Sequence, residues 1–346
     1  MSFETPGYDE ILDLYIAYGY VECLIRAGVE EITLIPKGRR YVIETNNPYP
    51  IEKGIVHALE DMLALHKALG RYSPKEGSKV VSNVDFSAGA NINNVYWDGV
   101  PKMLDEIKNT LKSGKTLSPK RKITIPMTIM PSAGKFMPKR YGVEGGNPVK
   151  ADSLSYALAW IGFHYYTSYL SYTKSNSTWV HIYALKPLEP LGLVEVLALK
   201  DLKKPVNSYY EKQGEFLSHR RQALLYHITH TESLGALEVL TGKRFTLLAY
   251  TLEKAGNNQA IRSYNEEDIS KLIEFLWRLK AENPYYAVRF IDNLLRNDLE
   301  FSTAFIEGIL YDKPDGIYTA IRGMQRSGKK VPQDVISAIQ RWLDES

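Results

Sequence analysis

The densest positive charge in the chain lies in residues 112–150, called here the basic segment. It holds nine Lys and Arg side chains and a single acid, Glu144. The wider window of residues 101–150 carries a net charge of +8 in a protein whose total is +3, so the remainder sums to −5. Positive charge gathered in this way is typical of a surface that binds a phosphate backbone. A solvated basic loop without a ligand is the alternative interpretation.

The basic segment has two unlike parts. Lys120, Arg121 and Lys122 precede a stretch of alternating apolar residues in which Pro126 permits only an edge or bulged strand, and we expect them to give non-specific backbone attraction. Residues 131–150 are rich in Gly and Pro, so their backbone is able to approach a ligand closely. The second part therefore holds the candidates for a reader loop. Its phosphate-binding candidates are Lys135, Lys139, Arg140 and Lys150, and its base-contacting candidates are Phe136, Tyr141 and Asn147.

Other basic clusters stand outside this segment. His219 is followed by Arg220 and Arg221, which we take as further phosphate-binding candidates, although a solvated helix turn explains them equally well. The same two interpretations apply to the tip of an early hairpin and to a cluster near the C-terminus. These clusters are Lys37, Arg39 and Arg40, and Arg322, Arg326, Lys329 and Lys330.

Motifs that carry catalysis are absent or incomplete. Ser113-Gly114-Lys115-Thr116 resembles the end of a phosphate-binding loop, but Asn109 stands where the first glycine is required. The single cysteine, Cys23, excludes an internal disulfide and a multi-cysteine zinc site. The sequence therefore predicts no catalytic residue, no metal ligand and no cofactor.

Three histidines on one expected helix leave a metal site open as an alternative. His219, His227 and His230 are spaced so that all three fall on one face. Neither an HExxH pattern nor a paired acidic ligand accompanies them. A surface or partly buried polar role is the simpler interpretation.

Length and composition describe a globular protein. The chain has 346 residues, of which 44% are hydrophobic, and this length favours about two domains. No apolar run approaches a membrane span, and the N-terminus lacks the pattern of a signal peptide. We expect a cytoplasmic protein with no membrane contact.

Hydrophobic periodicity indicates the elements that must position the basic segment. Residues 9–27 and 51–69 predict helices, and between them residues 31–35 and 39–45 predict a hairpin with Pro36-Lys37-Gly38 as its turn. Residues 70–98 indicate a long loop.

After the basic segment, Asp152 or Ser153 is expected to cap an aromatic helix over residues 154–170. Strands are expected at residues 178–185 and 193–199, and only helices from about residue 208 onward. The fold class is therefore α+β. An N-terminal mixed α/β lobe with antiparallel hairpins spans residues 1–205, includes the basic central loop, and precedes an all-helical lobe at residues 206–346.

Two stretches resemble a known family. DLYIAYGYVECLIRAGVEEITL at the first helix and hairpin, and GGNPVKADSLSYALAWIGFHYY at the later helix, resemble the large subunit of archaeal type I-A CRISPR interference (Cascade) complexes. The resemblance implies a non-enzymatic role in antiviral defence, with DNA and RNA binding. It also implies recognition of the motif that flanks the target, while base pairing with the guide reads the sequence. The implied partners are guide RNA, target DNA, the other subunits and the nuclease-helicase.

Two other functions remain as alternatives. A scaffold that meets acidic protein partners through the basic segment needs no nucleic acid of its own. An enzyme with a metal on the histidine face is the third hypothesis.

Overall fold

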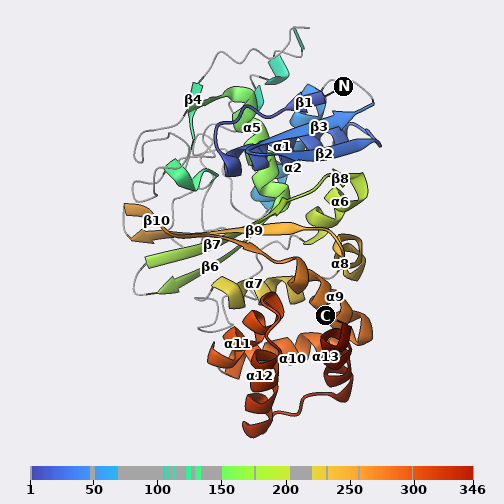
Figure 1. Ribbon diagram of the computed structural model, residues 1–346. Helices are drawn as coiled ribbons and strands as arrows, with labels where there is room; N and C mark the ends of the chain where they lie inside the picture. The colour runs from blue at the N-terminus through green and yellow to red at the C-terminus, as the bar shows by residue number, and fades with distance from the viewer. Residues whose placement is uncertain are drawn as a thin grey trace. The chain divides into compact units, whose positions relative to one another are not determined.

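The computed structural model is shown in Figure 1. It describes most of the chain but leaves out the expected long loop at residues 70–98 and most of the basic segment. The described residues are 2–46, 51–68, 104–105, 107–109, 112–113, 122–125, 129–133, 150–174, 177–202, 220–230, 233–255, 258–297 and 299–345. By packing, the chain forms two compact units. Unit 1 consists of residues 1–193 and 248–265, and unit 2 of residues 194–247 and 266–346.

The centre of unit 1 is the helix α1 (Glu10–Arg26), which is buried on nearly all sides. Its first turn is fixed by Asp9, whose Oδ1 accepts hydrogen bonds from the backbone N–H groups of Ile11 (3.0 Å) and Leu12 (3.3 Å). The chain leaves the helix at Gly28, which has φ +79° and so occupies the left-handed region that favours glycine. Both ends agree with the helix expected at residues 9–27.

Helices α2 (Ile51–Ala68) and α5 (Ser153–Tyr166) lie beside α1 (Figure 1). Glycines stand at the points of closest approach. A Cβ on Gly19 of α1 would collide with the backbone of Leu158, and one on Gly162 of α5 would collide with the backbone of Tyr15. Gly54 of α2 lies in the same way against the backbone of Cys23. Backbone therefore packs directly on backbone at both contacts of α1.

Helices α1 and α5 run parallel. Near their first residues, the Tyr8 hydroxyl donates to Asp152 Oδ2 (3.1 Å), and near their last residues the Tyr166 hydroxyl donates to Glu22 Oε2 (3.2 Å). Because the contacts advance together along both helices, their N-termini lie at the same end of the pair.

The first sheet has the strand order β1-β3-β2-β8. Its strands are β1 (Ser2–Glu4), β2 (Ile32–Lys37), β3 (Arg40–Thr45) and β8 (Leu191–Gly192). The antiparallel β2–β3 hairpin confirms the sequence prediction, but Pro36 lies within β2, opposite Tyr41. The turn is instead Gly38-Arg39, with Gly38 at φ +65°, since a two-residue hairpin turn needs a residue that tolerates positive φ.

The second sheet has the strand order β10-β9-β7-β6. Its strands are β6 (Thr167–Lys174), β7 (Ser177–Pro187), β9 (Phe245–Ala255) and β10 (Asn258–Asp268). Two predictions are wrong here. The helix expected to reach residue 170 ends at Tyr166, because residues 167–174 pair antiparallel with β7, and residues 245–268 are strands in a region expected to be helical.

Unit 2 is built from helices. They are α6 (Leu193–Leu202), α7 (Arg220–Thr229), α8 (Leu234–Leu240), α9 (Ser270–Glu282), α10 (Pro284–Asn297), α11 (Leu299–Leu310), α12 (Pro314–Arg326) and α13 (Gln333–Glu345). Its core includes Phe275, whose ring meets Phe305 edge-on at 5.6 Å and Trp342 at 5.3 Å between centroids. The strand expected at residues 193–199 is wrong, because Val196, Leu199 and Leu202 recur every third residue and are buried as one helix face.

The α+β class is confirmed, with antiparallel sheets in the N-terminal half and a mainly helical C-terminal region. The packing units are discontinuous in sequence. The domains expected at residues 1–205 and 206–346 stay a prediction.

Replacing Gly19 by Ala is expected to lower the free energy of unfolding by about 1–3 kcal/mol, because the added methyl overpacks a backbone contact. Chemical denaturation measures the change. The matched control is Gly235→Ala in α8, where a Cβ meets nothing within 4 Å and a gain of about 0.5–1 kcal/mol is expected. Equal effects of the two substitutions would contradict the close contact of α1 with α5.

Candidate nucleic-acid interface

A short antiparallel ladder brings together the two ends of the main part of the basic segment. Strands β4 (Lys122–Thr124) and β5 (Lys150–Asp152) pair with Lys122 opposite Asp152 and Thr124 opposite Lys150. The chain that leaves β4 therefore returns to its starting point at β5. Lys150 is exposed there, immediately before the buried Ala151.

The ladder leads straight into α5. Asp152 ends β5 and caps the helix, since its Oδ1 accepts from the Ser155 backbone N–H (2.9 Å) and its Oδ2 from the Ser155 hydroxyl (2.7 Å). This resolves the choice between Asp152 and Ser153 in favour of Asp152. The far end of the basic segment is thus fixed to the N-terminus of a buried helix.

A second attachment ties the middle of the segment to α1. The short 3₁₀ turn η2 (Pro131–Ala133) places Ser132 against the α1 cap, where its hydroxyl donates to Asp9 Oδ2 at 2.7 Å, and both side chains are buried. Ser132 consequently lies at the N-terminus of α1, and Lys150 stands just before the Asp152 cap of α5. These two termini are neighbours, because Tyr8 donates to Asp152.

Two buried carboxyl groups organise this end of α1. Asp13 accepts from the backbone N–H groups of Gly7 (2.6 Å) and Asp9 (3.0 Å), while Asp9 accepts from the first turn and from Ser132. Burial raises the pKa of both carboxyl groups, and the hydrogen bonds offset part of that rise.

Most of the sequence-predicted site residues lie outside the described residues. Those are Lys120, Arg121, Lys135, Phe136, Lys139, Arg140, Tyr141 and Asn147. Of the remainder, Lys122 and Lys150 sit on the paired strands β4 and β5, and Arg220 is the first residue of α7.

Arg221, also on α7, is held by acidic side chains of unit 2. Its Nη2 donates to Glu267 Oε1 (2.7 Å) and its Nη1 to Glu307 Oε1 (2.8 Å), and Nη2 also reaches the Tyr311 hydroxyl (3.0 Å). Desolvation lowers the pKa of this guanidinium, but the hydrogen bonds and charges of the two carboxylates outweigh it, and the net shift is upward. The group links α7 to β10 and α11, an interaction that the sequence did not indicate.

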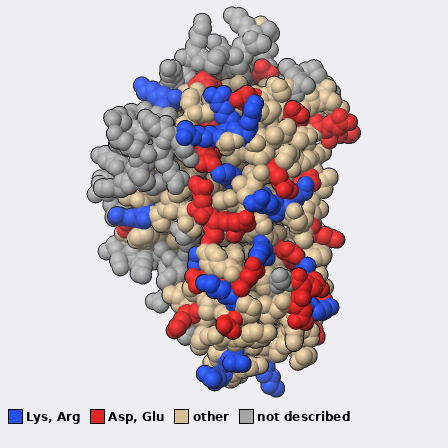
Figure 2. Space-filling view, viewed as in Figure 1, with Lys and Arg blue, Asp and Glu red and all other residues tan. Residues whose placement is uncertain are grey.

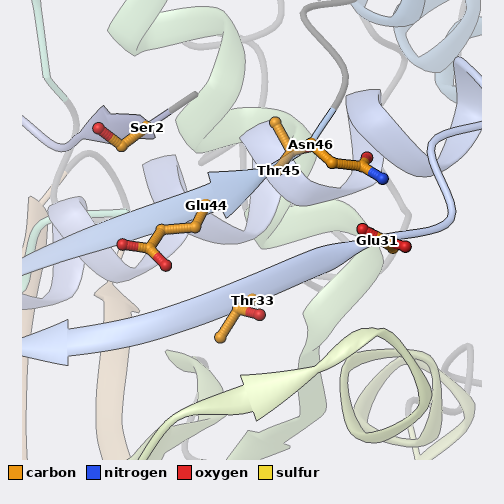
Figure 3. Close-up of a pocket in the computed structure, with 6 residues that line it drawn as sticks. All are labelled: Ser2, Glu31, Thr33, Glu44, Thr45 and Asn46. Carbon is orange, nitrogen blue, oxygen red and sulfur yellow. The ribbon is translucent and has the colours of Figure 1, made fainter.

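A polar hollow lies on the first sheet. Figure 3 shows Ser2, Thr33 and Glu44 side by side on strands β1, β2 and β3, with Glu31, Thr45 and Asn46 completing the lining. Two carboxylates in one hollow repel phosphate. This surface does not extend the candidate interface.

Comparison with known proteins decides the family. The family model described as CRISPR-associated protein (Cas_Csa4) matches residues 1–346. The chain belongs to the Cas_Csa4 family. It is also 57% identical to "CRISPR-associated protein Cas8a2/Csa4" of Methanocaldococcus jannaschii over 350 residues, which is 99% of this chain and 92% of the relative. The resemblance to the large subunit of archaeal type I-A complexes is confirmed at this level.

Of the three histidines singled out in the sequence, only His230 has a described side-chain contact in this Cas_Csa4 chain. His230 Nε2 lies 3.3 Å from Asp292 Oδ1, while His219 lies outside the described residues. Within the described ranges, no three His, Cys, Asp or Glu side chains are placed to share a metal ion, and no helix is long and apolar enough to cross a membrane.

The raised pKa of Asp13 predicts a pH-dependent stability difference. Because the folded state binds the Asp13 proton more tightly than the unfolded chain, whose aspartates titrate near pH 3.9, the contribution of Asp13 falls as pH rises from about 3.9 through the raised pKa. Urea unfolding of the parent and of Asp13→Asn between about pH 4 and 7 measures this. The parent should lose stability relative to the variant as pH rises, and a difference that stays constant would contradict the shift.

Proposed function

We propose that this Cas_Csa4 chain is the non-enzymatic large subunit of an RNA-guided CRISPR interference complex. In this role it binds the backbones of guide RNA and target DNA and helps to recognise the motif that flanks the target. Membership of the CRISPR-associated family supports the setting. The other subunits and the nuclease-helicase are its proposed protein partners.

The observation that carries the nucleic-acid role is the anchoring of the basic segment. The β4–β5 ladder and the Ser132–Asp9 hydrogen bond attach residues 134–149 to two neighbouring helix N-termini. Because α1 and α5 are packed backbone against backbone, these attachments rest on a rigid support. The stretch from Lys122 to Lys150, which holds five cations and one acid, thus has both of its ends attached to the fold.

Within the segment we propose two tasks. Lys120, Arg121 and Lys122 attract the phosphate backbone without regard to sequence, which an RNA-guided complex allows because base pairing reads the target. Residues 135–150 act as the reader loop. Lys135, Lys139, Arg140 and Lys150 contact phosphates there, while Phe136, Tyr141 and Asn147 contact bases.

Arg220 and Arg221 have a smaller proposed share. Arg221 is already paired with two carboxylates. These carboxylates would repel a phosphate that approaches the guanidinium, so Arg221 binds it weakly. We propose that α7 lies at the margin of the nucleic-acid path.

The triple variant Lys135→Gln, Lys139→Gln and Arg140→Gln tests the site. Affinity for DNA carrying a flanking motif should fall, and the dependence of log K on log salt should become shallower by about 1 for each phosphate that the variant no longer binds. The matched control is Lys271→Gln, Arg278→Gln and Arg341→Gln, which removes the same charge from residues that already form ion pairs. Fluorescence anisotropy across a salt series measures both.

Two outcomes would contradict the proposal. Absence of binding at low salt rejects the nucleic-acid role, and an equal decrease of affinity in the triple variant and its control rejects the assignment to the loop. Partners that stay bound after nuclease treatment, in a chain with no nucleic-acid affinity, would favour the scaffold instead.

A further inference from the structure

A row of cations runs along the exposed face of α12 in unit 2. Arg322 and Arg326 follow Tyr318 on α12 at steps of four residues, and Lys329 lies just beyond the end of the helix at Arg326. Lys330 follows directly. Residues 325–330 are all exposed, and Tyr318 is 45% exposed. On a helix, steps of four place side chains about 6 Å apart on one side.

The opposite face of α12 is fixed against α11. Ile317, Ala320 and Met324 are buried there. A Cβ on Gly316 would meet the Ala304 carbonyl, and one on Gly323 would meet the ring of Phe301. The exposed row is therefore presented by a helix that packs closely along its length.

The chain after α12 is ordered by a helix-ending motif. Gly328, at φ +77°, donates its N–H to the Gln325 carbonyl (3.1 Å), and the Lys329 N–H returns to the Met324 carbonyl (3.0 Å). The backbone of Lys329 is thus tied to the last turn of the helix, and the exposed Lys329 and Lys330 lie just past its end.

These four cations lack acidic partners among the described residues. Arg278 and Arg341 each pair with glutamates in the same unit, whereas Arg322, Arg326, Lys329 and Lys330 form no ion pair or hydrogen bond through their side chains with any described residue. The acid of α12 itself, Asp315, lies in the first turn, at the other end of the helix. Figure 2 shows Lys and Arg side chains at the lower tip of this view, where α12 ends in Figure 1.

Stabilisation of the helix does not account for the whole row. A cation near a helix C-terminus contributes roughly 0.3–1 kcal/mol, and the effect is confined to the last turn. Arg326 fills that place. Arg322 one turn earlier and two lysines beyond the end have no such role.

We propose that the α12 row, Arg322, Arg326, Lys329 and Lys330, binds the phosphate backbone of a DNA duplex. An exposed helix end with several cations fits the wide grooves and regularly spaced phosphates of B-form DNA. Single strands instead favour a groove lined by several aromatic rings, and the row offers only Tyr318. The major groove of double-stranded RNA is too deep and narrow for such an end. This surface lies on a different unit from the basic segment, so it adds a second DNA-binding surface to the proposed function.

The double variant Arg322→Gln and Arg326→Gln in the full chain tests the row. For a DNA duplex, the dependence of log K on log salt should become shallower by about 2, about 1 for each cation removed. Binding of single-stranded DNA and double-stranded RNA should change little. The control, Arg278→Gln and Arg341→Gln, removes the same charge from paired residues and should keep the parent slope. Thermal unfolding of both variants shows that the fold is retained.

Four results would overturn this assignment. The parent does not bind a DNA duplex, or the double variant keeps the parent's dependence of log K on log salt. The control loses as much duplex affinity as the double variant, or the double variant loses affinity only for single-stranded DNA or RNA. The reader-loop variant keeps the two proposals apart. If that variant fails to bind while Arg322→Gln and Arg326→Gln bind as the parent does, the α12 row is rejected and the proposed function stands.

Discussion

The close packing of α1 against α5 is the constraint on which the candidate interface depends. Gly19 and Gly162 let the two backbones meet without side chains between them, and Gly54 does the same for α2. Because α1 and α5 run parallel, this packing places their N-termini together, where Asp9 and Asp152 each cap a helix. Both caps also hold the basic segment, through Ser132 and through β5. The two attachment points of the basic segment are thus positioned by the backbone packing of α1 on α5.

The two units present positive charge in the same physical way. In unit 1 glycines at a helix–helix contact support the helix ends from which a cationic segment departs, and in unit 2 glycines pack α12 on α11 so that its outer face carries a cationic row. Arg221 shows the contrasting case, in which two carboxylates neutralise a guanidinium that links α7 to β10 and α11. Exposed cations without acidic neighbours keep the capacity to exchange counterions for phosphates.

Local signals explain what the sequence predicted. Helices α1 and α2, the β2–β3 hairpin and the Asp152 cap follow from periodicity, turn residues and side-chain capping, all read within a few residues. The failures are non-local. Strands β9 and β10 belong to a sheet with β6 and β7, and Glu267 and Glu307 reach Arg221 across 46 and 86 residues. For the site, charge located the basic segment, but no sequence pattern indicated its attachment to Asp9.

Purification of the tagged chain from its native host tests the central claim most directly, because a subunit of an RNA-guided complex must be found with its guide. We expect a small RNA and the other interference subunits to co-purify with the chain, and the RNA to be missing when the basic segment is neutralised. Recovery of the chain free of RNA, or with protein partners that need no nucleic acid, would contradict it.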